Sequence, residues 1–198
     1  MKFSRKILLL ILFASVLFAQ NNSTETTWVI DKSHSKIGFS VTHLLISEVE
    51  GYFKDYSAKI VTKGEDFDNV QIEFIAKTSS IFTDNEKRDQ HLKSDDFFNS
   101  EKYPELKFVG KSFKKVENNK YKLSGDLTIR DVTKPITLDV EFNGKVKDPW
   151  GNIRAGFNIT GKLNRFDYGL KWNALTELGG AVVDNIVKLR IHVELIKQ

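Results

Sequence analysis

Residues 84–108 read DNEKRDQHLKSDDFFNSEKYPELKF and form the one stretch of the chain with a convincing helical pattern. Asp84 or Asn85 can cap a helix start, because a short polar side chain there accepts a hydrogen bond from a free backbone N–H group. Pro104 prevents a helix from continuing, since proline lacks the backbone donor. The stretch therefore predicts one short helix, or two turns with a kink, laid across a sheet as a lid with its charged side in water.

The chain outside this stretch alternates apolar and polar residues with a period of two, which predicts strands with one buried face. The clearest segments are 36–41, 70–77, 122–129, 136–142, 153–163 and 187–195. Less regular strands are predicted at 51–62 and 106–116. We therefore predict a mainly all-β domain, an extended antiparallel barrel of about eight strands that is closed to hide its edges, with the short helix capping one end.

Two glycines lie on the predicted inward side of this barrel, Gly125 and Gly161. Glycine weakens a strand unless a sharp bend or a close approach requires it. At these positions it either forms a corner of the barrel or leaves space inside. An eight-stranded barrel is of the size at which side chains fill the interior or one small ligand occupies it.

The first residues have the pattern of an export signal. Basic residues precede an uninterrupted apolar run that starts at Ile7, and the run is too short to span a bilayer. We predict a cleavable signal peptide at 1–19, a disordered leader at 20–26 and a single domain at 27–198. The chain contains no Cys, so this exported domain relies on its core rather than on disulfides.

The charge balance argues against a nucleic-acid partner. The chain has 30 Lys and Arg residues against 26 Asp and Glu residues, and three of the basic residues, Lys2, Arg5 and Lys6, belong to the predicted signal peptide. The remaining 27 basic residues nearly balance the acids, so the mature chain lacks the basic surplus of a nucleic-acid-binding domain.

No motif for catalysis, a metal or a cofactor is evident. The histidines, His34, His43, His91 and His192, lack the spacing of a zinc site, and there is no G-x-S-x-G elbow or glycine-rich phosphate loop. A site assembled in space from His34, His43 and His91 is less expected than structural roles for them. We predict no catalytic residue, no metal and no cofactor.

Several separated blocks of sequence resemble one known family. They are WVIDKSHSKIGFSVTHLLISEVEGYF at 28–53, RDQHLKSDDFFNSEKYPELKF at 88–108, GDLTIRDVTKPITL at 125–138, RFDYGLKW at 165–172 and VVDNIVKL at 182–189. Over about residues 27–197 the chain resembles the YceI-like polyisoprenoid-binding proteins. The resemblance implies a lipocalin-like barrel with a capping helix, export to the periplasm, or secretion where there is no outer membrane, and a long isoprenoid lipid in the lumen.

The alternation and the resemblance together select candidate site residues. The predicted lumen residues are Phe39, Phe53, Ile72, Phe74, Phe97, Phe98, Phe108, Leu127, Ile129, Phe157, Ile159, Leu170 and Trp172. Plain core packing is an equally good explanation for each of them. Arg88, Asp89 and His91 match the family's RD-x-H block and are candidates for contact with a lipid headgroup or for docking of the lid. The irregular segment 164–184 is a candidate gate.

The leading hypothesis is an exported, non-catalytic protein that holds an isoprenoid quinone or polyprenyl lipid for transport, storage or sequestration. Transient membrane contact fits this hypothesis, and the oligomeric state stays open, with a dimer as one option. One alternative is an enzyme acting on such a lipid through His91 with Asp89 or Glu86. Another is a stress-related, partner-binding barrel whose lumen is filled by its own core.

Overall fold

The computed structural model describes residues 25–64, 67, 70–177 and 179–198. The predicted signal peptide and the first part of the predicted leader, 20–24, lie outside these residues. The elements are β1 (Glu25–Ile30), β2 (Lys36–His43), β3 (Ser47–Phe53), β4 (Tyr56–Lys63), β5 (Gln71–Lys77), η1 (Thr78–Ser80), β6 (Ile81–Phe82), α1 (Glu86–Lys93), β7 (Glu105–Glu117), β8 (Lys120–Ile129), β9 (Val132–Lys147), β10 (Ile153–Asn164), η2 (Arg165–Tyr168) and β11 (Val183–Lys197). None of the helices in the described residues is long and apolar enough to cross a membrane.

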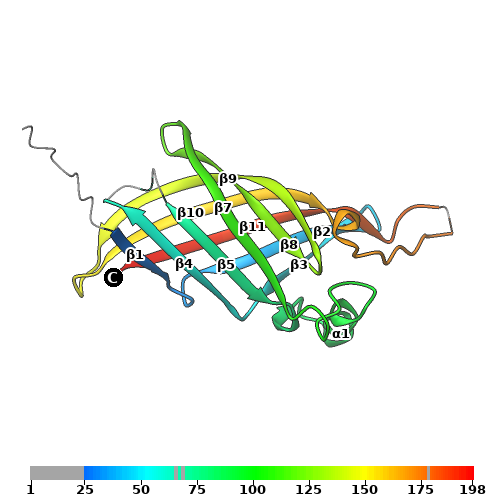
Figure 1. The fold of residues 1–198 in the computed structure, drawn as a ribbon. Helices are drawn as coiled ribbons and strands as arrows, with labels where there is room; N and C mark the ends of the chain where they lie inside the picture. Colours follow the sequence, from blue (N-terminus) through cyan, green and yellow to red (C-terminus); the bar gives the residue numbers. More distant parts are fainter. Residues whose placement is uncertain (1–24, 65–66, 68–69, 178) are drawn as a thin grey trace, which may run out of the picture.

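The strands form an elongated antiparallel barrel, as predicted (Figure 1). Its ring runs β1-β4-β5-β7-β8-β9-β10-β11 and returns to β1, so eight strands close it. Apolar side chains on the inward faces follow the period of two, with burial alternating along β8 and β9. The barrel therefore has an apolar interior and a polar exterior.

Strand β11 closes the ring by pairing with two strands along one edge. Its residues from Val183 to His192 pair with β2, and those from Leu195 to Lys197 pair with β1. Its other edge pairs with β10. From β2 the sheet continues through β3 to β6, so these strands form a branch beside the ring. We call the end near β6 and α1 the lid end, and the opposite end, near β1, the base.

The structure corrects three predicted boundaries. Strand β1 begins at Glu25, so the last two residues of the predicted leader belong to the barrel. The single strand predicted at 51–62 is two strands, because the chain turns at 54–55, where Lys54 N–H and Asp55 N–H both bond to Ser80. This interruption, with β1 and the short β6, raises the total above the predicted eight, although the ring itself keeps eight.

The third correction concerns the helix, which is shorter than the stretch from 84 to Pro104 allows. Asn85 caps it, and its side chain accepts from Arg88 N–H, as predicted for this position. The helix ends at Lys93 because Ser94 turns away: its N–H and its hydroxyl both donate to His91 O. Proline is therefore not what ends the helix.

At the base, Arg154 ties three segments of the chain together. Its guanidinium donates to Asp31 Oδ2 at 2.8 Å, to Asp148 Oδ2 at 2.7 Å and to Glu194 Oε1. These acids lie after β1, after β9 and in β11. The side chain of Arg154 is 17% exposed, so the ion pairs are largely shielded from water. Asp31, His34 and Glu194 have ligand atoms within 4.8 Å of one another, because Arg154 bonds to both acids and His34 Nδ1 lies 3.0 Å from Asp31 Oδ2.

Two of the acids around Arg154, Asp31 and Asp148, are held in their charged form. Hydrogen bonds from Ser33, His34 and Arg154 hold the pKa of Asp31 well below its usual range. Burial raises the pKa of Asp148, but the hydrogen bonds that it accepts, chiefly from Arg154, outweigh burial and hold that pKa well below its ordinary value. Folding therefore favours the deprotonated carboxylates.

We expect this network to make the fold sensitive to acid. A carboxyl whose pKa is lowered by folding stabilises the protein above its unfolded-state pKa, and this contribution is lost as the pH falls below about 4. Arg154→Met should lower the urea midpoint at neutral pH and flatten its dependence on pH below about 4. The matched control is Arg190→Met, which removes exposed ion pairs with Glu48 and Glu50 and should change little. An unchanged pH profile in Arg154→Met would contradict this account.

Candidate functional site

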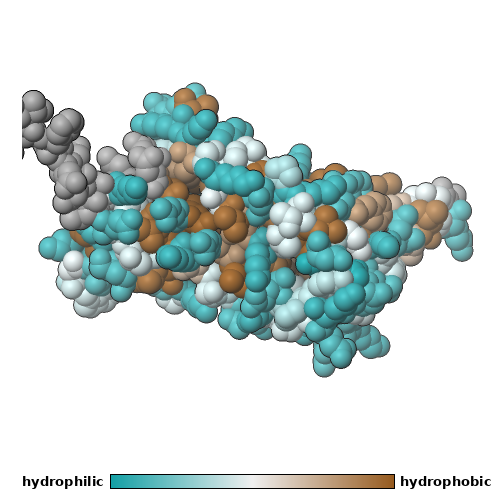
Figure 2. Space-filling model, viewed as in Figure 1, coloured by the Kyte–Doolittle hydropathy of each residue, from teal (hydrophilic) through white to brown (hydrophobic). Residues whose placement is uncertain are grey.

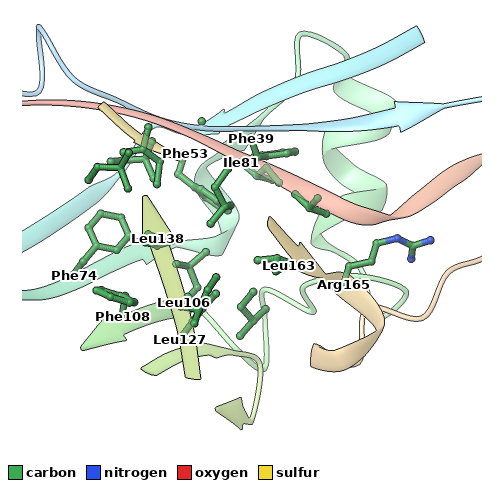
Figure 3. Close-up of a pocket in the computed structure, with 18 of the residues that line it drawn as sticks. Phe39, Phe53, Phe74, Ile81, Leu106, Phe108, Leu127, Leu138, Leu163 and Arg165 are labelled. Atoms are coloured by element: carbon green, nitrogen blue, oxygen red, sulfur yellow. The ribbon is translucent and has the colours of Figure 1, made fainter. Parts of the chain in front are cut away.

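The barrel encloses a cavity of about 410 Å³ whose wall is almost entirely apolar. Figure 3 shows Phe74, Phe108 and Leu127 from neighbouring strands pointing into a common space. Every ring strand from β4 to β11 supplies side chains to the wall, together with β2, β3, β6, α1 and the segments after α1 and after η2. The interior is thus wider than its own side chains can fill.

All of the predicted lumen residues line this cavity. They are Phe39, Phe53, Ile72, Phe74, Phe97, Phe98, Phe108, Leu127, Ile129, Phe157, Ile159, Leu170 and Trp172. Sequence reasoning passed over other lining residues, among them Ile37, Leu138, Leu163 and Leu189, although they follow the same alternation. The structure places the predicted lumen residues on the cavity wall, and their role in ligand binding stays a prediction.

Two inward-facing glycines leave space that neighbouring side chains occupy. A Cβ atom on Gly125 would lie 2.4 Å from Val109 O and 2.5 Å from the Phe108 ring. Gly161 likewise leaves space for the Leu138 side chain, whose Cδ2 would lie 2.5 Å from an added Cβ. The inward register predicted for both glycines is therefore correct, and the space they leave is taken by neighbouring side chains.

An aromatic cluster plugs the base of the cavity. Phe67, from the connection between β4 and β5, is 8% exposed and packs its ring against Trp28 and Phe157, with centroid distances of 5.0 and 4.9 Å. Trp28 is buried, and its indole N–H donates to Thr62 Oγ1. Sequence reasoning missed Phe67, because it is a single apolar residue in a polar turn with no period to mark it.

Among the residues that the structure describes, the polar groups on the cavity wall lie toward the lid end. They come from His43, Thr83, Arg88, His91 and Arg165. Each of these residues lies at or beyond the lid-end terminus of its strand, or on α1. The cavity is therefore amphipathic along its length, with a hydrocarbon-like body and one polar end.

The predicted trio at the lid divides into different roles. Arg88 lines the cavity while its Nε and Nη2 donate to the hydroxyl and carbonyl oxygens of Thr83. Asp89 is buried, does not line the cavity, and accepts from the N–H and the hydroxyl of Thr83. Asp89 thus fixes the start of the lid, and the prediction that it contacts a headgroup does not fit its position.

His91 faces the cavity on one side and the surface on the other. Its Nε2 lies 2.8 Å from Asp96 Oδ2, and its ring meets Phe97 and Trp172 edge to face at 5.1 and 5.4 Å. Asp96 is 56% exposed. The acid–base pair proposed for an enzyme, His91 with Asp89 or Glu86, is therefore not what the structure assembles.

Two arginines hold the segments around the polar end by donating to backbone carbonyls. Arg130 Nη1 donates to Asp95 O, Phe97 O and Gly169 O at 3.0 to 3.1 Å, and its Nη2 pairs with the Asp95 carboxylate. Arg130 therefore joins the chain after α1 to the chain after η2.

Arg165 is the second of these arginines and is 2% exposed. Its guanidinium points away from the labelled aromatic side chains (Figure 3) and donates to the carbonyl oxygens of Leu170, Trp172, Val183 and Asp184. Burial lowers the pKa of this guanidinium. Sequence reasoning named 164–184 as a candidate gate but missed the residue that holds both of its ends.

Comparison with known proteins assigns the chain to a family. A family model described as YceI-like domain matches residues 28–195. The chain belongs to the YceI-like family. Among YceI-like proteins, Protein YceI of Escherichia coli O157:H7 is 36% identical over 196 residues, covering 98% of this chain and 99% of the relative.

Solved structures of YceI-like proteins share the fold. The crystal structure of Campylobacter jejuni YCEI protein has a TM-score of 0.67 at 38% identity, covering 85% of this chain and 96% of that one. A polyisoprenoid binding domain from Saccharophagus degradans has a TM-score of 0.62 at 15% identity, covering 87% and 99%. The second likeness concerns the fold alone.

The close approach at Gly125 gives a stability prediction. Gly125→Ala should lower the free energy of unfolding by about 2 kcal/mol, because the added methyl group meets a backbone carbonyl that cannot move aside. Gly156→Ala is the matched control, since its nearest neighbour, Asn143 Cβ, would be 3.5 Å away, an ordinary contact. Urea unfolding measures both variants, and equal effects would contradict the packing argument.

The Arg165 clamp gives a second prediction. Arg165→Met should cost about 3 kcal/mol, since buried carbonyl groups lose their donor, and should speed hydrogen exchange in 169–184 more than in the β7–β8 hairpin. Arg165→Lys should restore only part of the loss, because an ammonium group has fewer donors in a less extended geometry. Uniform acceleration across the barrel would show that Arg165 supports the fold as a whole rather than this segment.

Proposed function

We propose that this protein is an exported lipid-binding protein whose cavity holds the chain of an isoprenoid lipid, of the quinone or polyprenyl type. The observation that carries the proposal is a cavity of about 410 Å³ with an apolar body, where the polar groups that the described residues supply gather at one end. A molecule of matching character has a long hydrocarbon chain and a small polar head. Membership of the YceI-like family supports this class of ligand, since one protein of the same fold is described as a polyisoprenoid binding domain.

The wall of the cavity suits a hydrocarbon chain because it offers dispersion contacts without fixed polar partners. Along the body of the cavity, phenylalanine rings from β2, β5, β7 and β10 alternate with branched aliphatic side chains. Such a wall binds in proportion to the apolar area that it covers. It favours length and flexibility in a ligand over a particular pattern of hydrogen bonds.

The polar end suits a headgroup with oxygen acceptors. Arg88 donates through Nε and Nη2 to Thr83, and its Nη1 has no hydrogen-bond partner among the described residues. His91 uses Nε2 toward Asp96. We propose that Arg88 and His91 contact the headgroup, with the phosphate of a polyprenyl lipid or the carbonyl of a quinone as the acceptor.

The proposed setting is the periplasm, or the outside of the cell where there is no outer membrane, and it rests on the predicted signal peptide at 1–19. In this setting the protein carries, stores or sequesters lipid without chemical change. His91, which lines the cavity, pairs with Asp96, a carboxylate that is 56% exposed and does not line the cavity, so the proposal gives this pair no catalytic role. A lumen filled by its own core, expected for a barrel that only binds partners, does not match the cavity.

The decisive experiment identifies what the protein contains. Protein purified from its own periplasm without detergent is measured by native mass spectrometry and then extracted with organic solvent. We expect one isoprenoid class at a near-equal molar ratio. Protein that is empty and also takes up no prenyl probe would contradict the proposal.

A matched variant connects the bound lipid to the cavity. Phe74→Trp places extra bulk on the cavity wall and should lower the ratio of lipid to protein, with a change in unfolding free energy below about 1 kcal/mol because space is available. Val146→Thr changes a side chain that is 63% exposed and should leave the ratio unchanged. A loss of about 1–3 kcal/mol in Phe74→Trp would indicate a filled core instead.

A further inference from the structure

Four aliphatic side chains project into water at the lid end of the barrel. Leu44, Leu45 and Ile46 form the turn between β2 and β3 and are 40%, 72% and 86% exposed, and Leu175 in the segment after η2 is 62% exposed. We call these residues the apolar tip. Figure 1 shows both segments at the same end of the barrel, and Figure 2 shows apolar residues on this projecting end.

The two parts of the apolar tip are joined to each other. Leu44 N–H donates to Val182 O at 2.9 Å, and Leu175 forms an isolated bridge with Ala181. Leu45 Cδ1 lies next to Gly180, where an added Cβ would be 3.7 Å away. The apolar tip is therefore one surface made by two neighbouring segments.

The backbone of the turn between β2 and β3 is strained at its two leucines, and the shape of the turn does not require leucine there. Leu44 and Leu45 have φ values of +51° and +63°, which L-residues with large side chains rarely adopt. Glycine or asparagine forms such a turn without strain. Leucine at both positions costs stability and also exposes apolar surface, so the shape of the turn does not explain these residues, whereas a contact outside the molecule does.

The apolar tip also adjoins the polar end of the cavity. His43 precedes the turn, and Val182 and Val183 follow the second segment, and all three line the cavity. The exposed apolar surface and the cavity wall are therefore continuous along the chain, at the end where polar groups line the cavity.

We propose that the apolar tip docks on the surface of a lipid bilayer, inserting its leucine and isoleucine side chains beside the end of the cavity through which lipid passes. This inference rests on the proposed function and adds the membrane-facing surface to it. A bilayer accepts a small convex apolar projection, since its interfacial region deforms around inserted side chains. A second copy of the chain would need about 800 Å² of complementary surface per partner, more than four partly exposed side chains present.

Charge near the apolar tip indicates that insertion, rather than electrostatic attraction, drives the docking. Glu48, just after the turn, is paired with Lys188 and with Arg190. Arg190 also pairs with Glu50, so these two acids and two bases compensate one another and leave no excess positive charge in this group to attract anionic lipid. Docking should therefore depend little on ionic strength.

The test is flotation with vesicles of phosphatidylcholine that contain no isoprenoid. The wild-type protein should float, equally at about 50 mM and about 500 mM salt. Leu45→Asn combined with Ile46→Asn should bind at least tenfold more weakly, because two inserting side chains are lost. This variant should fold, since asparagine tolerates the positive φ of position 45. Val146→Asn, which changes an exposed valine on β9 near the base, should float like the wild type.

Three outcomes would overturn the proposal. In the first, the wild-type protein does not float. In the second, it floats only at low salt, and the double variant floats equally well. In the third, sedimentation shows that the wild type is a dimer and the double variant a monomer, and neither binds vesicles. The last outcome would assign the apolar tip to a second copy of the chain.

Uptake of a prenyl probe from detergent micelles keeps this test separate from the proposed function. Uptake should be equal in the wild type and the double variant. Uptake without flotation would support the proposed lipid-binding function and contradict the proposed docking surface. Flotation without uptake would support the docking surface and contradict the lipid-binding function.

Discussion

The structure depends on how strand β11 closes the sheet. One edge of β11 pairs with β2 toward the lid end and with β1 toward the base, so this edge has two different neighbours. At the base, the ring is complete and every neighbouring strand is hydrogen bonded. Toward the lid end, the branch ends at β6, and no described strand pairs with its free edge. That part of the wall is completed by α1 and the segment that follows it.

This difference gives the two ends of the cavity different mechanical properties. Opening the base requires breaking strand pairing and the aromatic cluster around Phe67. The free-energy cost of this opening is that of unfolding part of the core. At the lid end, Arg130 and Arg165 hold the irregular segments by bonds to carbonyl groups, which water can replace one at a time. An arginine clamp also avoids placing carboxylates beside an apolar cavity. Motion is therefore expected at the lid end, where the polar groups also lie.

Sequence reasoning succeeded where the structure repeats a simple pattern. Alternation fixes which face of each strand points inward, so it placed Phe74, Leu127 and Phe157 on the cavity wall. It failed where one side chain acts through tertiary contacts. Nothing local marks Phe67 as a plug, and Arg165 has its carbonyl partners on segments that the fold alone brings together. Proximity of Asp89 and His91 in the sequence suggested a pair, but a helix points them at different partners.

An apolar cavity does not by itself decide whether a lipid stays inside. At about 0.8 kcal/mol for each buried CH₂ group, a chain of several isoprene units gains more than the roughly 20 kcal/mol at which real affinities saturate. A bilayer offers nearly the same gain for the same chain. For the proposed cargo, the balance between barrel and bilayer is then set by smaller quantities: ordering of the chain in the barrel, the proposed contact of the headgroup with Arg88 and His91, and opening of the segments held by Arg130 and Arg165. The last two of these quantities belong to the lid end, and none of the three involves a chemical step, so the proposed loading and release need none.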